Sequence, residues 1–175
     1  KRAFENMPWR TFEPRLEPRT TRWGVAPRED VVRAFLTAHV FHLGPLRDEP
    51  RALYSSSMPS EMAEVGVRGE RAVMCLRLYG AQDCVCPLVE DGRVKAVYRS
   101  LSSAVNYWGE RLGLFSDVRV QAETKFGTVC EISARGGSSA LHADLTNVGV
   151  GVSQALPVIV LCLAVPPGNT ILIEQ

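Results

Sequence analysis

The sequence has no apolar run long enough to cross a lipid bilayer. Its longest apolar stretch, residues 155–167, is shorter than the roughly 20 residues of a spanning helix and contains prolines. The charged start, Lys1 and Arg2, is not followed by the apolar segment of a secretory leader. We therefore expect no membrane association and no export signal.

Cysteine is scarce and forms no recognisable pattern. The five cysteines are an odd number without a disulfide framework, which predicts a reducing, cytoplasmic compartment. Cys84 and Cys86 lack a second pair of ligands, and the three histidines fall into no zinc-binding spacing. We interpret both cysteines as buried structural residues, since free cysteine behaves as a small apolar group.

The chain also lacks excess charge of either sign. Its formal net charge is +1, so the molecule as a whole has no strong attraction for nucleic acid. Residues 1–28 differ, because they hold seven basic residues against three acidic ones. This stretch is either a local basic patch or a solvated segment. Its four prolines predict an extended lead segment, followed by one domain over residues 29–175.

Beyond the lead segment, the hydrophobic pattern mixes helical and strand periods. Val94, Val97, Leu101 and Val105 recur at three- and four-residue steps, and Gly113 is a natural helix end. We expect a helix from residue 27 that leads into a short buried strand at 39–44, and further helices over 69–80, 93–114 and 153–165. The other strands expected are a β-hairpin of 117–123 with 128–135 and a buried strand at 169–175. Loops are expected over 44–70 and 136–147. The fold class predicted is therefore α/β, with a β-hairpin and packed helices.

The end of the chain combines features of a ligand site. The run "NVGVGVSQALP" opens a buried helix, "PPG" reverses the chain, and the apolar strand "TILIEQ" ends in an acid. In open α/β folds ligands lie beyond the carboxyl ends of strands, where Glu174 stands, and a carboxylate there suits Mg²⁺. The alternative is that Glu174 is only the first exposed residue after a buried strand.

The segment "DLTNVGVGVSQALPVIVLCLAVPPGNTILIEQ" closely resembles part of the ABC-type ATPases, in the broad group that includes the RecF, SMC and OLD proteins. The segments "FHLGPLRDEPRALY", "VGVRGE" and "AVNYWGERLGL" are similar to the same group in the same order, so the resemblance covers roughly residues 38–175. It implies a partial ABC-type ATPase core of the P-loop NTPase kind, with a signature loop at 147–154 and a Walker B-like strand at 170–175.

The resemblance also implies roles for individual residues. Gly149 and Gly151 match the signature loop, which contacts ATP bound to the opposite subunit of a dimer. Ser153 follows them, either as a hydroxyl donor or as a helix N-cap, with Pro157 expected near the end of the first helical turn. Glu174 takes the place of the Mg²⁺-associated acid. The resemblance also makes Gln154 and Arg47 candidate nucleotide-contacting residues and Gln175 a candidate for orienting the attacking water.

The sequence departs from that family in three places. Gly149 stands where the signature serine is usual, and Gln175 stands where the catalytic glutamate is usual. No G-x-x-x-x-G-K-[ST] phosphate-binding loop occurs in the 175 residues. We therefore expect an internal piece of a longer ATPase that by itself does not bind ATP tightly or hydrolyse it.

Two functions remain open at this stage. The first is a segment of an ATPase that uses ATP and Mg²⁺ at a dimer interface to drive a DNA-related or defence process. Its partners would be a second copy or the remaining part of the ATPase, with DNA or an effector nuclease as further candidates. The second is a degenerate, inactive ATPase lobe that serves as a protein-binding scaffold.

Overall fold

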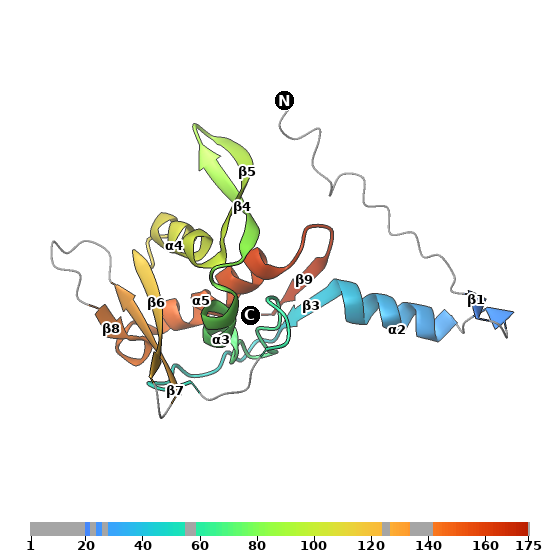
Figure 1. Ribbon diagram of the computed structural model, residues 1–175, viewed down its shortest axis with the longest axis horizontal. Coiled ribbons are helices and arrows are strands. Elements are labelled where there is room, and N and C mark those ends of the chain that lie inside the picture. The colour runs from blue at the N-terminus through green and yellow to red at the C-terminus, as the bar shows by residue number, and fades with distance from the viewer. Residues whose placement is uncertain are drawn as a thin grey trace.

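The chain folds into helices and small sheets of the mixed α/β class (Figure 1). The computed structural model describes residues 20–21, 24–25, 28–54, 59–123, 127–133 and 142–174. The helices within these ranges are α2 (Arg28–His39), α3 (Ala72–Tyr79), α4 (Leu101–Arg111) and α5 (Val150–Ala164), with the short 3₁₀ helix η2 (Leu145–Asn147). The strands are β1 (Thr20–Thr21), β2 (Gly24–Val25), β3 (Val40–Leu43), β4 (Asp83–Glu90), β5 (Arg93–Ser100), β6 (Asp117–Glu123), β7 (Gly127–Ser133), β8 (His142–Asp144) and β9 (Thr170–Ile173).

Helix α5 forms the centre of the core. It is apolar on almost every side, which is typical of a helix surrounded by other elements. Leu156, Val160 and Leu161 are at most 1% exposed. Helices α3 and α4 and strand β4 pack around it. The predicted buried helix at 153–165 is therefore confirmed, and it begins three residues earlier, at Val150.

Two strands far apart in the sequence form a parallel pair beside α5. β3 pairs with β9 in a register that sets Val40 opposite Thr170 and Leu43 opposite Ile173. Both strands were predicted, but the prediction that they are buried is wrong for most of their residues. Leu43 is fully buried, whereas Leu172 is 51% exposed and Ile173 is 37% exposed. The pair lies on α5 with part of its apolar surface uncovered.

The predicted helix over 93–114 is wrong in its first third. Residues Arg93–Ser100 form β5, which pairs with β4 in an antiparallel hairpin. The hairpin turn is Asp91-Gly92, and both residues have positive φ, 48° and 70°. An Asp-Gly pair in this conformation is the preferred two-residue hairpin turn, so the sequence "EDGR" contained a signal for it.

Helix α4 occupies the remainder of that segment. Ser100 caps its start, with its side chain accepting a hydrogen bond from the N–H of Ser103. At the other end the N–H groups of Gly113 and Leu114 donate to the carbonyls of Glu110 and Gly109, with Gly113 at φ 73°. This is the Schellman arrangement, and the expected role of Gly113 as the helix end is confirmed.

The third sheet contains the predicted hairpin. β6 pairs with β7 along its whole length, as expected. The segment predicted as a loop at 136–147 is partly regular instead: β8 adds to β7 as a third strand, and η2 follows. The long stretch between β3 and α3 is free of helix and extended strand wherever the structure describes it, as predicted.

The first part of the chain lies largely outside the described residues. The expectation of an extended lead segment over residues 1–28 can be compared only at β1 and β2, which pair as two short antiparallel strands. Helix α2 follows as predicted and runs directly into β3. None of the helices within the described ranges combines the length and apolar character that crossing a lipid bilayer requires.

Candidate functional site

The candidate site lies at the carboxyl ends of β3 and β9. Because the two strands are parallel, the residues that follow them meet at one edge of the pair. The N–H of Glu174 donates to the carbonyl of Leu43 over 2.9 Å, which extends the ladder by one residue. This bond fixes the backbone of Glu174 while leaving its side chain exposed.

The carboxylate of Glu174 is paired with a histidine on the neighbouring strand. Oε1 of Glu174 lies 2.6 Å from Nε2 of His42. The side chains are 57% and 41% exposed, so water reaches both. The spacing of the histidines in the sequence bears only on zinc binding, and no sequence signal predicts this role of His42, because the pairing depends on the register of β3 with β9.

Arg47 approaches the same residue from the loop after β3. Its Nη2 atom donates to the backbone carbonyl of Glu174 over 3.2 Å. Its Nη1 atom is buried and has no hydrogen-bond partner among the described residues. The structure therefore brings together two of the predicted site residues, Arg47 and Glu174, and adds His42 to them. Gln175 lies outside the described residues.

The predicted signature loop leads into α5. Gly149 is the N-cap residue, without a side-chain cap, and Val150 is the first helical residue. A Cβ placed on Gly149 or Gly151 would have no atom within 4 Å. Packing therefore does not require glycine at either position. In the first turn the N–H of Val152 donates to the carbonyl of Gly149 over 2.9 Å, whereas the N–H groups of Val150 and Gly151 precede the helical ladder. This end of α5 is open to a ligand.

Ser153 and Pro157 take positions other than those expected. Ser153 is 6% exposed, and its hydroxyl donates to the carbonyl of Val150 over 2.9 Å within the same helix. It is therefore not the N-cap, and its hydroxyl is directed away from solvent. Pro157 is not in the first turn but in the helix interior, buried against Gly69. Gln154 is exposed.

The two halves of the predicted site are not joined by direct contacts. No hydrogen bond or ion pair between the described residues links Gly149 or Gly151 to Arg47 or Glu174. Within the described ranges there is also no cluster of three or more histidine, cysteine or acidic side chains that would hold a metal ion. A cation at Glu174 would therefore take most of its ligands from water and phosphate, as Mg²⁺ commonly does.

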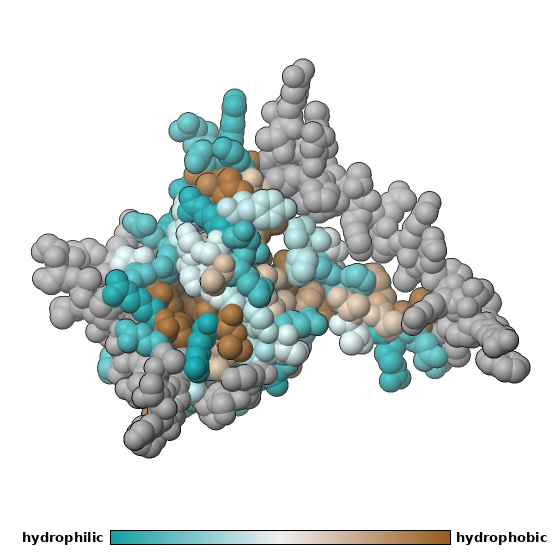
Figure 2. Space-filling view, in the orientation of Figure 1, coloured by the Kyte–Doolittle hydropathy of each residue, from teal (hydrophilic) through white to brown (hydrophobic). Residues whose placement is uncertain are grey.

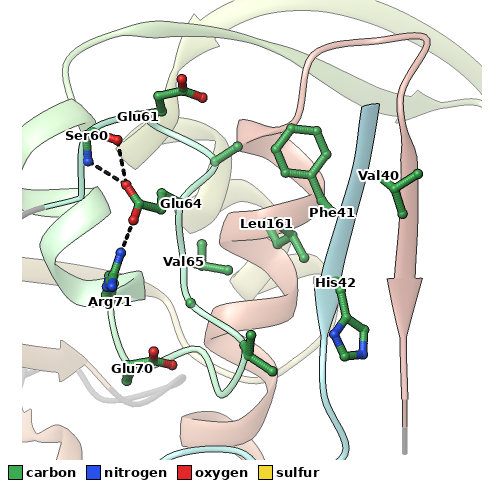
Figure 3. Close-up of a pocket in the computed structure, with 13 residues that line it drawn as sticks. Val40, Phe41, His42, Ser60, Glu61, Glu64, Val65, Glu70, Arg71 and Leu161 are labelled. Atoms are coloured by element: carbon green, nitrogen blue, oxygen red, sulfur yellow. Dashed lines mark hydrogen bonds and ion pairs between the residues drawn. The ribbon is translucent and has the colours of Figure 1, made fainter. Parts of the chain in front are cut away.

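An open groove lies between β3 and the loop before α3, and His42 is one of the residues that line it (Figure 3). Its volume is about 470 Å³, and Phe41, Val65 and Leu161 are among the apolar residues that line it. Glu64 stands at its rim and accepts hydrogen bonds from the N–H and hydroxyl of Ser60, at 2.6 and 2.8 Å. The same carboxylate forms an ion pair with Arg71, so its charge is compensated within the loop.

None of the cysteines whose side chains the structure describes forms a hydrogen bond with His42, Arg47 or Glu174. Cys75, Cys84 and Cys86 are buried, and burial raises the pKa of Cys75 to about 12 and that of Cys84 to about 11. Thiols with such pKa values stay protonated near neutral pH and are poor nucleophiles and metal ligands. This agrees with the interpretation of Cys84 and Cys86 as structural residues.

Comparison with known proteins gives no matching family model, no matching curated protein and no matching solved structure. The function must therefore be argued from the residues and their arrangement.

Proposed function

We propose that the chain is part of an ABC-type ATPase and supplies two elements of its ATP site. The first is the Mg²⁺-associated acid, Glu174, and the second is the signature loop with Gly149 and Gly151. In the complete protein, ATP would be bound and hydrolysed at a dimer interface to drive a DNA-related or defence process. The phosphate-binding loop is not among these 175 residues, so the proposal requires it from another segment or another chain.

One observation carries the proposal: the strand "TILI" ends in an exposed carboxylate beside a second parallel strand and an arginine. The hydrogen bonds of Glu174 to Leu43 and Arg47 fix the position of this residue at the carboxyl edge. Parallel strands present their ligands at that edge, which is where an ATPase of this kind needs its acid. The sequence alone does not predict that Arg47 and Glu174 lie close together in the fold.

The chemistry of these residues fits a magnesium nucleotide. One carboxylate oxygen of Glu174 contacts the imidazole of His42, and the side chain of Glu174 is more than half exposed. Arg47 brings its guanidinium to the backbone carbonyl of Glu174, and a charged guanidinium at this edge suits an anionic ligand. Mg²⁺, when bound, would neutralise phosphate charge. The residues of this chain would orient that ion through Glu174 and offer the open N-terminus of α5 to the anion.

The alternative, an inactive scaffold lobe, has one observation in its favour. His42 already occupies an oxygen of Glu174 at 2.6 Å, and such a pair is stable without any metal. The two functions make opposite predictions for nucleotide dependence. If the chain is part of an ATPase, the complete protein dimerises only with ATP. If the chain is an inactive scaffold lobe, association of the complete protein does not depend on ATP.

The proposal is tested on the complete protein encoded by the parent reading frame. Gly151→Asp and Glu174→Gln are compared with wild type in ATP-dependent dimerisation, by light scattering, and in phosphate release. We expect Gly151→Asp to abolish dimerisation, because it places a negative charge against phosphate, and Glu174→Gln to reduce hydrolysis at least about tenfold, on the scale of removing one transition-state contact.

Thr146→Asp is the matched control. It adds the same charge in η2, just before the signature loop, on an exposed side chain. It should leave dimerisation and phosphate release within about twofold of wild type, a change of less than about 0.5 kcal/mol. Unchanged dimerisation and hydrolysis in both test variants would exclude the proposed roles of Gly151 and Glu174.

A further inference from the structure

Two loops at the carboxyl end of β3 are joined to each other by backbone hydrogen bonds. The N–H of Gly44 donates to the carbonyl of Val67 over 2.7 Å, and the N–H of Asp48 donates to the carbonyl of Arg68 over 2.8 Å. The first loop follows β3 and the second precedes α3. Because each loop fixes the other, the side chains of Asp48 and Arg68 start from backbone positions that the fold defines.

The turn that carries Arg68 is also held by its own glycines. The N–H of Gly69 donates to the carbonyl of Gly66 over 3.1 Å, and the two glycines have φ values of 75° and 84°. Such positive values are unfavourable for other residues. A Cβ at Gly69 would lie 2.5 Å from Pro157 of α5, so the turn packs directly on the central helix. The turn thus presents Arg68 on a rigid support.

The carboxylate of Asp48 lies between two arginines. Nη2 of Arg51 is 2.9 Å from Oδ2 of Asp48, and Nη2 of Arg68 is 3.8 Å from Oδ1. The side chain of Asp48 is only 13% exposed, whereas those of Arg51 and Arg68 are 56% and 57% exposed. The negative charge is therefore mostly buried, and the two positive charges face water. We call these three residues the arginine clamp.

Neither guanidinium of the arginine clamp forms an aligned hydrogen bond with a described residue. The 2.9 Å contact of Arg51 is an ion pair only, since Oδ2 of Asp48 has no hydrogen-bond partner among the described residues. The 3.8 Å contact of Arg68 is longer than a hydrogen bond. A guanidinium has five donors, so both arginines keep donors for a ligand beside their contact with Asp48. One arginine already compensates the single charge of Asp48, and the second leaves a local excess of positive charge.

Two further carboxylates on these loops do not pair with the arginine clamp. Glu70 is directed to the backbone, where it accepts a hydrogen bond from the N–H of Arg68 over 2.9 Å. Glu49 is exposed and forms no ion pair with either arginine within the described ranges. Arg47, in the same loop, adds another positive charge and donates to the carbonyl of Glu174. The arginine clamp therefore adjoins the candidate site at the carboxyl end of β3.

We propose that the arginine clamp binds a phosphate group. The two Nη2 atoms are at most about 9 Å apart, because only the width of a carboxylate, about 2.2 Å, separates their contacts with Asp48. A phosphate that accepts one charge-assisted hydrogen bond of about 2.8 Å from each arginine spans about 8 Å, so one phosphate group reaches both. The planar guanidinium also matches the oxygens of a phosphate group in pairs.

This site goes beyond the proposed function, which gives the arginine clamp no role. The phosphate belongs either to the end of a nucleotide or to the backbone of a nucleic acid, since both present the same kind of oxygen. Neither Mg²⁺ nor a second subunit is needed, so the arginine clamp binds phosphate whether or not the chain belongs to an ATPase. Phosphate binding by the clamp and ATP-dependent dimerisation of the complete protein can therefore fail independently.

The test measures binding to the 175-residue chain by isothermal titration calorimetry, without Mg²⁺ and at about 25 mM salt, where charges are weakly screened. The probes are sodium pyrophosphate and, separately, a short oligothymidylate. Wild type should bind at least one of them. Arg51→Gln and Arg68→Gln should each weaken that binding at least about fivefold, because each removes a charge-assisted hydrogen bond to phosphate.

Two exposed arginines elsewhere provide matched controls. Arg119 is also 56% exposed and lies 2.8 Å from an aspartate, Asp117, but no second arginine pairs with that aspartate among the described residues. Arg93 stands near the tip of the β4–β5 hairpin, where Figure 2 shows hydrophilic surface. Arg119→Gln and Arg93→Gln remove the same charge as the test variants and should bind like wild type. Circular dichroism should show unchanged folding in all four variants, because exposed ion pairs contribute little to stability.

The two probes identify the source of the phosphate. Loss of pyrophosphate binding in both test variants assigns the site to a terminal phosphate, and a loss confined to the oligothymidylate assigns it to a nucleic acid. The proposal is overturned if wild type binds neither probe, or if either test variant binds both probes as wild type does. An equal loss in Arg119→Gln or Arg93→Gln would also overturn it, because net charge alone would then account for the binding.

Discussion

His42 and Glu174 lie 132 positions apart in the chain, yet Nε2 of the histidine is 2.6 Å from Oε1 of the glutamate. The two residues meet because β3 and β9 are parallel neighbours with a register that sets His42 opposite Leu172. The pair is exposed to water, and the acid is also held through its backbone by Leu43 and Arg47. We infer that His42 orients the carboxylate rather than stabilising the fold.

Substitution of His42 separates these two roles. Exposed ion pairs contribute about 0–1 kcal/mol, so His42→Ala should lower the free energy of unfolding by less than about 1 kcal/mol in a urea titration. In the complete protein, the proposed function predicts that the rate of phosphate release by His42→Ala falls severalfold. His42→Gln, whose amide still donates to a carboxylate, should retain most of it. Equal losses in both variants would show that the hydrogen bond is not what matters.

Much of the architecture could be predicted because it is encoded locally. Gly113 ends α4 through its positive φ, and the apolar run around Leu161 can only be a buried element. The helix predicted over 93–114 failed because Val94 and Val97 continue the three- and four-residue spacing of Leu101 and Val105. The Asp91-Gly92 turn lies just before this segment and pairs residues 93–100 with β4, and this strand pairing overrides the helical spacing.

The candidate site was less predictable, for a physical reason. The resemblance of their segments predicts Glu174 and Arg47 as site residues, but their contact depends on a parallel pairing between strands that are distant in sequence. The role of His42 depends on the same register, as a shift by one residue would turn its side chain to the other face. The inward rotation of the Ser153 hydroxyl likewise follows from where α5 begins, which its sequence does not mark with an N-cap side chain.

Gly109 is required by a close contact inside the core. A Cβ at this position would collide with the ring of Phe115, which is fully buried. Gly109→Ala should therefore lower the free energy of unfolding by about 1–3 kcal/mol, although alanine is the better helix former. Gly151→Ala is the matched control, because a Cβ there meets no atom within 4 Å. Gly151→Ala should raise the free energy of unfolding by up to about 1 kcal/mol. A urea titration measures both variants.

Ser153 should prove dispensable for nucleotide-dependent behaviour. Its hydroxyl is bonded to the carbonyl of Val150 and buried, so it is not presented to a ligand at the helix end. Ser153→Ala removes one internal hydrogen bond and should change the free energy of unfolding by about 1 kcal/mol or less. In the complete protein it should leave ATP-dependent dimerisation intact, in contrast to Gly151→Asp. A loss comparable to that of Gly151→Asp would mean that this helix end rearranges when ATP binds.

The buried thiol of Cys75 should make the free energy of unfolding depend on pH in the alkaline range. Burial is the main cause that raises its pKa from 9.0 to about 12, and its Sγ donates to the carbonyl of Glu64 over 3.4 Å. Below pH 9 the thiol is protonated in both the folded and the unfolded chain, so it causes no pH dependence. Between pH 9 and about 12 the unfolded chain loses this proton while the folded chain keeps it. The free energy of unfolding must therefore fall as the pH rises through this window, by at most about 1.4 kcal/mol per pH unit.

The contribution of Cys75 can be isolated by comparing two buried residues of α3. Cys75→Ala removes both the titrating group and its packing, so it should be less stable than wild type at pH 8, and the difference should shrink as the pH rises above 9. Val73→Ala also removes buried methyl groups but no titrating group, and its difference from wild type should stay constant with pH. Urea titrations from pH 7 to 10.5 measure both differences. A constant difference for Cys75→Ala would show that the thiol ionises as readily in the folded chain as in the unfolded one, which its burial argues against.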